Sequence, residues 1–322
     1  MDRLTTSPRV VIVTPAARHS TSGNRTTALR WAGLLRQLGA SVRVVERWQG
    51  EPCDVLVAVH AVKTASSVLA AAAALPGVRI VVLLAGTDVY PRFDPPAEAL
   101  RALERADALV GLQPHARDAL PPAARTRFRT IVQSATAAAA NRGPTFRACV
   151  LAHLRPVKDP LLPIEALAHV PPGLSLELCL AGRALTPELA AAVQVAAARD
   201  PRVRWLGELP RAAAKRLLAS CDACVVPSEA EGGANVVSEA IAAGTPVLAT
   251  AIPGNLGLLG DDWPATFPVG DAAALGRLLV RTATEATFAA ELRQRTCALQ
   301  PLVAPARERE AWRSLLLDLG ER

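Results

Sequence analysis

The sequence has few aromatic residues, few lysines and no apolar run long enough to cross a membrane. Aromatic residues make up 3% of the 322 residues, and only three of the 36 basic residues are lysines, Lys63, Lys158 and Lys215. Nucleic-acid surfaces interleave basic with aromatic side chains, and membrane-binding surfaces present basic and aromatic patches, so we expect neither partner. The N-terminus lacks the apolar core of a signal peptide, and we expect a cytoplasmic protein.

The cysteines offer no evident metal site. Most of the six cysteines lie within apolar segments, where cysteine behaves as a small buried hydrophobe. Cys221 and Cys224 form a CxxC pair in "SCDACVVPS". No second Cys or His pair with zinc spacing follows, so the pattern favours core packing. The net charge of +7 suits a small anionic substrate.

Apolar, strand-like segments alternate with helical patterns along the whole chain. Continuous Val and Ile runs, rather than alternating ones, indicate strands buried on both faces, as in a parallel sheet covered by helices. In the first half we predict strands at 9–15, 41–46, 53–60, 78–86, 107–113 and 129–135, and a helix at 26–39 that Asn24 or Thr26 could cap.

The pattern restarts after "ATAAAANRGP" (135–144), which we interpret as a linker. Further strands are predicted at 146–152, 175–182, 203–207, 222–228 and 245–250, with helices near 160–169, 187–198, 211–219 and 235–243 and from about 271 onwards. The fold class is therefore α/β, with two tandem Rossmann-like domains and a ligand cleft between them. We expect an N-terminal domain at 1–140, a C-terminal domain at 141–300, and a last helix at 301–322. This last helix could pack back on the N-terminal domain.

One stretch, "PSEAEGGANVVSEAIAAGTPV" (227–247), carries two acids around a glycine turn. Gly232 and Gly233 let the backbone approach a ligand, and the start of the following helix offers N–H groups to an anion. Glu239, about one turn into that helix, can accept hydrogen bonds from two vicinal hydroxyls. Glu231 could instead cap the helix, but Glu239 lies too deep for that role.

The same stretch resembles the donor-binding motif of nucleotide-sugar glycosyltransferases with the GT-B fold. The matching positions are Pro227, Ser228, Glu231, Gly232, Glu239, Ala240, Gly244, Pro246 and Val247. The resemblance implies that Glu239 binds the ribose of the nucleotide. It also implies that the donor sugar and diphosphate contact Glu231, Gly232, Gly233, Ala234 and Asn235.

These enzymes also carry an Arg and a Lys just after the first strand of the second domain, which neutralise the leaving diphosphate. Here the segment reads "LAHLRPVKDP". Lys158 matches the Lys, but His153 occupies the Arg position and Arg155 follows two residues later, so either could assist. No acidic pair suited to Mg²⁺ is present, and a side-chain cation can stabilise the leaving charge instead of a metal. We therefore expect no metal or other cofactor.

The N-terminal half resembles a narrow bacterial subgroup through "GNRTTALRWA", "HAVKTASS", "AGTDVY", "VQSA" and "HLRPVKDP". That subgroup includes the selenosugar synthases of selenoneine biosynthesis, which join a UDP-N-acetylhexosamine to selenophosphate. The resemblance implies the same carbon–selenium bond formation here, coupled to a selenophosphate synthetase, with a UDP-sugar that we take as UDP-N-acetylglucosamine. Lys63 stands where the subgroup has Arg, which keeps the charge but not a bidentate contact.

Loop residues at predicted strand ends form the candidate acceptor site. The resemblance to the glycosyltransferases implies that the glycine loop at Gly23 lies over the donor diphosphate. Selenophosphate, already an anionic nucleophile, needs positive charge and orientation more than a general base. The candidates for acceptor contact are Asn24, Arg25, His60, Lys63 and Thr87. The candidates for catalysis are His60, Asp88 and Lys158, although Asp88 could simply hydrogen-bond the backbone of its own turn.

Two other functions remain open on the sequence. A conventional glycosyltransferase acting on a hydroxyl acceptor would carry the same donor motif and would use Asp88 or His60 as its base. A module that binds nucleotide sugars without catalysis would also carry the motif, although the complete acidic pair disfavours it.

Overall fold

The computed structural model describes residues 7–90, 92–139 and 141–321 of the chain, which divide into two compact units. Unit 1 contains the described residues up to Gln133, together with Glu231–Gly233 and those from Pro305 onwards. Unit 2 contains Ser134–Ala230 and Ala234–Ala304. The domain boundary expected from the sequence falls at residue 140, which is outside the described residues.

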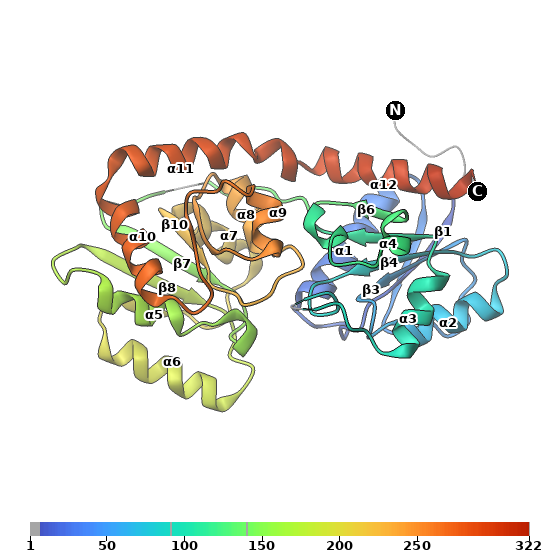
Figure 1. Ribbon diagram of the computed structural model, residues 1–322, viewed down its shortest axis with the longest axis horizontal. Coiled ribbons are helices and arrows are strands. Elements are labelled where there is room, and N and C mark those ends of the chain that lie inside the picture. Colours follow the sequence, from blue (N-terminus) through green and yellow to red (C-terminus); the bar gives the residue numbers. More distant parts are fainter. Residues whose placement is uncertain (1–6, 91, 140, 322) are drawn as a thin grey trace. The chain divides into compact units, whose positions relative to one another are not determined.

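Unit 1 is built on a parallel sheet (Figure 1). Its six strands have the order β2-β1-β3-β4-β5-β6. Alternate residues of β1 belong to two different core clusters, Val10 and Ile12 to one and Val11 and Val13 to the other. Both faces of the sheet are therefore buried, as the continuous apolar runs predict. The strands are β1 (Arg9–Val13), β2 (Ser41–Val45), β3 (Val55–Val59), β4 (Arg79–Leu84), β5 (Ala108–Gly111) and β6 (Phe128–Thr130).

Helices cover the two faces of this sheet. One cluster includes side chains of α1 and α12, and the other includes side chains of α2 and α3. The helices are α1 (Gly23–Gln37), α2 (Ala65–Ala74), α3 (Ala97–Arg105), α4 (Pro122–Arg125) and α12 (Pro305–Gly320), with the 3-10 turn η1 (Pro114–Arg117). Helix α1 begins three residues before the predicted start, and Ser22 is its N-cap, accepting from Arg25 N at 3.5 Å. The predicted caps at Asn24 and Thr26 are therefore wrong.

Unit 2 is also built on a six-stranded parallel sheet, with the strand order β12-β11-β10-β7-β8-β9. Its strands are β7 (Phe146–Leu151), β8 (Leu176–Ala181), β9 (Val203–Trp205), β10 (Ala223–Val226), β11 (Val247–Thr250) and β12 (Thr266–Phe267). Its helices are α5 (Leu162–Glu165), α6 (Pro187–Arg199), α7 (Arg211–Ser220), α8 (Asn235–Ala243), α9 (Pro253–Leu259), α10 (Ala272–Thr284) and α11 (Ala286–Ala298), with the 3-10 turns η2 (Pro156–Lys158), η3 (Ala166–His169) and η4 (Gln300–Val303).

Among the strands and α-helices of this unit, the sequence-based prediction missed β12 and α9. The predicted helix at 235–243 coincides with α8. Cys221 and Cys224 are fully buried free thiols, which confirms their prediction as core residues. None of the helices described combines the length and the apolar character that a membrane crossing needs.

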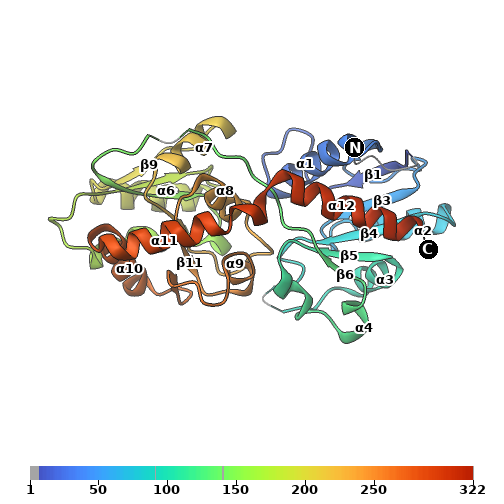
Figure 2. The same ribbon diagram turned by 90° about the horizontal axis from the view of Figure 1, so that it is seen from above.

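Helix α12 packs beside α1 within unit 1 (Figure 2). The rings of Trp312 and Trp31 meet edge to face, with centroids 4.7 Å apart. Glu308 of α12 is buried and accepts a hydrogen bond from Trp31 Nε1 at 2.8 Å and one from Arg30 Nε at 3.3 Å. A buried carboxylate held in this way fixes the position of α12 on α1.

We expect Glu308→Ala to lower the free energy of unfolding by about 3 kcal/mol, because it leaves buried donors unsatisfied. The matched control is Glu310→Ala on the same helix, since Glu310 is exposed and paired with Arg313. That change should lower the free energy of unfolding by less than about 1 kcal/mol. Chemical denaturation measures both, and equal losses for the two variants would contradict the anchoring role of Glu308.

Candidate active site

The segments that carry the predicted donor residues follow neighbouring strands of unit 2. Strands β7 and β10 pair in parallel, so the chain leaves both at the same edge of the sheet. The segment after β7 contains His153, Arg155 and Lys158, and the loop after β10 leads into α8. The sheet order therefore places the predicted phosphate-binding lysine beside the first part of the predicted donor motif.

A backbone hydrogen bond joins these two segments directly. Glu229 N, in the loop after β10, donates to Val157 O in η2 at 3.0 Å. Lys158 is the last residue of η2 and is half-buried, and the left-handed Asp159 follows it. His153 is also half-buried, whereas Arg155 is exposed. Lys158 thus lies on a short turn that is hydrogen-bonded to the loop after β10, rather than on a long loop.

Helix α8 begins within the predicted donor motif. Its N-cap residue is Ala234, whose side chain cannot accept a hydrogen bond, and Asn235 is its first residue. Glu239 lies one turn further on and is half-buried. The helix ends at the left-handed Gly244. Backbone N–H groups near Asn235 and the carboxylate of Glu239 are therefore both features of one short helix.

Lys215 is a neighbour of Glu239 that was given no role on the sequence. It lies on α7, and its Nζ donates to Thr136 Oγ1 at 2.7 Å and to Thr136 O at 2.9 Å. Burial and the charge of Arg211 lower the pKa of Lys215, while the negative charge of Glu239 acts in the opposite direction. The scarcity of lysine was the only sequence signal that could have pointed to it.

The residues Glu231–Gly233 belong to unit 1. A Cβ on Gly232 would lie 2.5 Å from Ala85 O, and a Cβ on Gly86 would lie 2.7 Å from Gly232 N. Glu231 is buried. The backbones of Gly232 and Gly86 therefore approach so closely that a side chain at either position would force them apart.

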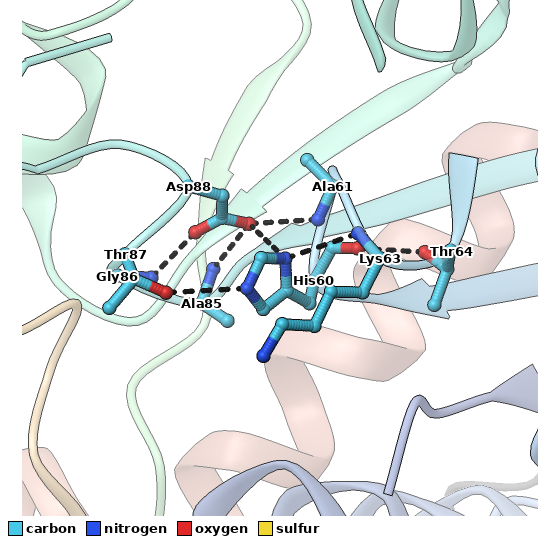
Figure 3. A network of polar contacts seen from close by, with 8 residues as sticks. All are labelled: His60, Ala61, Lys63, Thr64, Ala85, Gly86, Thr87 and Asp88. Carbon is cyan, nitrogen blue, oxygen red and sulfur yellow. Dashed lines mark hydrogen bonds and ion pairs between the residues drawn. The ribbon is translucent and has the colours of Figure 1, made fainter. Parts of the chain in front are cut away.

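In unit 1, His60 and Asp88 form a polar network at the ends of two neighbouring strands (Figure 3). His60 follows β3, and Asp88 lies in the turn after β4. Asp88 is buried, and its carboxylate accepts from Gly86 N at 2.7 Å, Ala61 N at 2.8 Å and Ala85 N at 3.1 Å. Asp88 thus binds the backbone of its own turn and ties that turn to the one after β3.

His60 is buried against this carboxylate in an unusual backbone conformation. Its φ is +89°, a region that a non-glycine residue rarely adopts and that is frequent at functional sites. Its carbonyl accepts from Thr64 Oγ1 at 2.8 Å, and its N–H donates to Leu83 O at 3.1 Å. These bonds hold the strained residue in place.

The contacts of the imidazole indicate one tautomer. Nδ1 lies 3.5 Å both from Asp88 Oδ2 and from Lys63 N, and it cannot donate to the first while accepting from the second. We assign the proton to Nδ1, because an unprotonated nitrogen would face a carboxylate that can only accept. Nε2 is then unprotonated, and its lone pair accepts from Thr87 Oγ1 at 3.3 Å. Burial lowers the pKa of His60, although Asp88 acts to raise it, so the ring is neutral at pH 7.

The other predicted acceptor residues surround the same edge of the sheet. Strand β1 neighbours β3, and α1 follows β1 with Gly23, Asn24 and Arg25 in its first turn. Asn24 and Arg25 are half-buried, whereas Lys63 and Thr87 are exposed. The three loops after β1, β3 and β4 therefore offer cations, a neutral imidazole and a hydroxyl on one edge of unit 1.

No group of three or more His, Cys, Asp or Glu side chains within residues 7–90, 92–139 and 141–321 is arranged to hold a metal ion.

We expect the pKa of His60 to lie below the ordinary value of about 6.5, because burial outweighs the effect of Asp88. An NMR titration of the imidazole C–H resonance measures it, with His60→Asn to assign the signal and the denatured protein as the control. Asn tolerates a positive φ better than most residues. A midpoint above that of the denatured protein would show that Asp88 dominates instead.

The same shift has a consequence for stability. Below pH about 6.5 the unfolded chain binds a proton at this position before the folded chain does, so the free energy of unfolding falls as the pH falls. The wild type should therefore lose more stability than His60→Asn between pH 7.5 and pH 5.5, values that bracket the ordinary histidine pKa of about 6.5. Parallel acid losses in the two proteins would contradict the shift.

A family model matches the second half of the chain. Residues 136–294 match the model described as Glycosyl transferases group 1. This segment forms most of unit 2 and just under half of the chain, and it contains both the Lys158 segment and the donor motif.

Solved structures resemble the whole chain in fold. The Anabaena protein HepE in complex with UDP-glucose has a TM-score of 0.74 at 17% identity and covers 97% of this chain and 99% of its own. Sucrose-phosphate synthase from Thermosynechococcus elongatus has a TM-score of 0.79 at 16% identity, over 98% and 100%. A glycosyltransferase from Rickettsia africae has a TM-score of 0.77 at 12% identity, over 97% and 98%.

At these identities the structural likeness establishes the fold, which is two parallel six-stranded sheets flanked by helices. The chain therefore has the GT-B fold, and over residues 136–294 it is similar to the group 1 glycosyltransferases.

Proposed function

We propose that this protein is a glycosyltransferase that joins the sugar of a UDP-sugar to selenophosphate and so forms a selenosugar. The donor is UDP-N-acetylglucosamine, and the product serves selenoneine biosynthesis in the cytoplasm. The anomeric carbon–oxygen bond to UDP breaks and a carbon–selenium bond forms. Water then cleaves the phosphorus–selenium bond, which releases phosphate. A selenophosphate synthetase supplies the acceptor.

One observation carries the donor part of this proposal. The Lys158 turn and the loop into α8 leave neighbouring parallel strands and are joined by the bond from Glu229 N to Val157 O, within the segment that matches the group 1 glycosyltransferases. The Anabaena protein HepE, which has a similar fold, has been crystallised with UDP and with UDP-glucose. A cation beside the motif supports binding of a sugar nucleotide.

Each donor residue has a separate role in the proposed site. Glu239 accepts hydrogen bonds from the ribose hydroxyls. Lys158, assisted by His153 or Arg155, stabilises the charge that grows on the departing diphosphate. Contacts to the donor sugar and the diphosphate come from Gly23, Glu231, Gly232, Gly233, Ala234 and Asn235.

The acceptor side supports an anionic nucleophile. Arg25 and Lys63 supply positive charge, while Asn24, Thr87 and the neutral His60 orient the acceptor. Asp88 already accepts three backbone N–H groups, so it positions His60 and the two turns rather than taking a proton itself. Selenophosphate needs no deprotonation by the enzyme, which fits this arrangement.

The decisive experiment is an incubation with UDP-N-acetylglucosamine and enzymatically made selenophosphate. Mass spectrometry should detect UDP and a selenium-bearing hexosamine, and a reaction without enzyme is the control. Absence of both products with correctly folded protein would contradict the proposal.

A second candidate function is supported by the His60–Asp88 pair. A neutral imidazole oriented by a buried carboxylate can take the proton of a hydroxyl acceptor. In that case the protein is a conventional glycosyltransferase. Transfer to sugar or alcohol acceptors that is lost in His60→Ala, with no selenium product, would favour this function.

Lys158→Ala should lower kcat by about 100-fold to 1,000-fold with little change in the Kd for UDP-sugar, because its charge acts mainly in the transition state. Lys158→Arg keeps the charge and should retain part of the activity. Steady-state kinetics and calorimetry measure the two quantities. Unchanged kcat in Lys158→Ala would remove Lys158 from the mechanism.

Glu239→Ala should instead weaken UDP-sugar binding by about tenfold to a hundredfold, the value of hydrogen bonds to a charged group. Glu229→Ala is the matched control, since the Glu229 side chain is exposed. That change should alter the Kd by about twofold at most. Equal effects of the two variants in calorimetry would argue against the ribose contact.

We further propose that turnover needs no divalent cation, because Lys158 supplies the positive charge and the sequence offers no acidic pair of the metal-binding type. Activity should therefore survive treatment with a chelator. A loss that added Mg²⁺ or Mn²⁺ restores would contradict this part of the proposal.

A further inference from the structure

A buried chain of hydrogen bonds lies behind the loop that follows β10. Thr250 Oγ1, at the end of β11, lies 2.6 Å from Ser228 O. Asn255 Nδ2, in α9, lies 3.1 Å from Thr250 Oγ1 and 3.1 Å from Thr250 O. Ser228 is 2% exposed, and Thr250 and Asn255 are 0% exposed. None of these contacts has a role in the proposed chemistry so far.

The partners fix the direction of every bond in this chain. Asn255 Nδ2 faces a backbone carbonyl, which can only accept, so the side-chain amide has one permitted orientation. The same Nδ2 then donates to Thr250 Oγ1, and the Thr250 hydroxyl gives its own proton to Ser228 O. Because all three residues are buried, water does not replace a partner that is removed.

The position of Ser228 explains why this bond is needed. The pairing of β10 with β11 ends at Val226 and Ala249, and Pro227 follows. Proline cannot donate to a sheet ladder, so the backbone leaves the sheet there. The Thr250 hydroxyl provides the next bond in place of the ladder. One residue later, Glu229 N is bonded to Val157 O on the other side.

We propose that Thr250 and Asn255 are positioning residues for the sugar-nucleotide site. They hold the carbonyl of Ser228 and thereby set the start of the loop that runs from Glu229 to Asn235. This inference rests on the proposed function, because that loop carries the donor contacts. Neither residue touches the substrate, and their effect is transmitted through the backbone of Ser228.

The strand β11 offers a matched control near its other end. Thr245 is also 0% exposed, and its Oγ1 donates to Leu218 O at 2.9 Å. Thr245→Val therefore removes a buried threonine–carbonyl bond of the same kind as Thr250→Val does. It leaves the contacts of Ser228 in place, so the two variants separate local positioning from a general loss of stability.

The experiment combines hydrogen exchange of the 229–235 amides with calorimetry of UDP binding, using the full chain. In Thr250→Val we expect faster exchange in this loop and a Kd for UDP about threefold to tenfold higher, the value of one net hydrogen bond. Thr250→Ser keeps the hydroxyl and should restore both quantities. Thr245→Val should leave loop exchange and UDP affinity as in the wild type.

Three results would overturn the inference. If the wild type binds UDP and Thr250→Val binds it equally well, the positioning role fails while the proposed function stands. If Thr245→Val has the same effect as Thr250→Val, the effect is one of general stability. If the wild type binds no UDP, both the proposed function and this inference are contradicted. Asn255→Ala supplies the same comparison if Thr250→Val does not fold.

Discussion

Backbone groups at the carboxyl ends of the parallel strands need hydrogen-bond partners, and in both units buried polar side chains supply them. A sheet ladder satisfies the strands only up to their last paired residues. In unit 1 the carboxylate of Asp88 accepts the N–H groups of Ala61, Ala85 and Gly86. In unit 2 the hydroxyl of Thr250 satisfies Ser228 O. Buried polar groups at these edges are therefore anchors for loops.

The anchoring in unit 1 also permits the strained conformation of His60. A residue with φ of +89° persists only where the surrounding bonds determine its position. Its backbone N–H and carbonyl are both bonded, and its imidazole rests against the anchored carboxylate of Asp88. In this position Nε2 lies 3.3 Å from Thr87 Oγ1 and accepts from that hydroxyl. A flexible loop could present the same ring, but it would not fix one tautomer of it.

Most of the fold could be predicted from the sequence because its signals are local. Val and Ile runs such as 9–15 and 78–86 located β1 and β4, and the glycines before and after 235–243 located α8. The bonds of Asp88 to the backbone of its own turn were one of the sequence-based alternatives, whereas its bond to Ala61 could not be predicted, since Ala61 is 27 residues away and its backbone N–H leaves no side-chain signal in the sequence. The same holds for Thr250 and Ser228, which are 22 residues apart. Ser22 was missed as a cap because the predicted helix began too late.

The division between the two units bears on the identity of the acceptor. The family match lies at residues 136–294, which form most of unit 2, so under the proposed function the acceptor contacts of unit 1 have to be argued from the chemistry of its own side chains. His60 is neutral at pH 7, since burial lowers its pKa, and it cannot balance the charge of an anion. In the proposed site that task falls to Arg25 and the exposed Lys63. A hydroxyl acceptor reverses the requirement, because it needs the lone pair of His60 and has no negative charge to neutralise. The two acceptor classes therefore depend on different side chains of the same sheet edge.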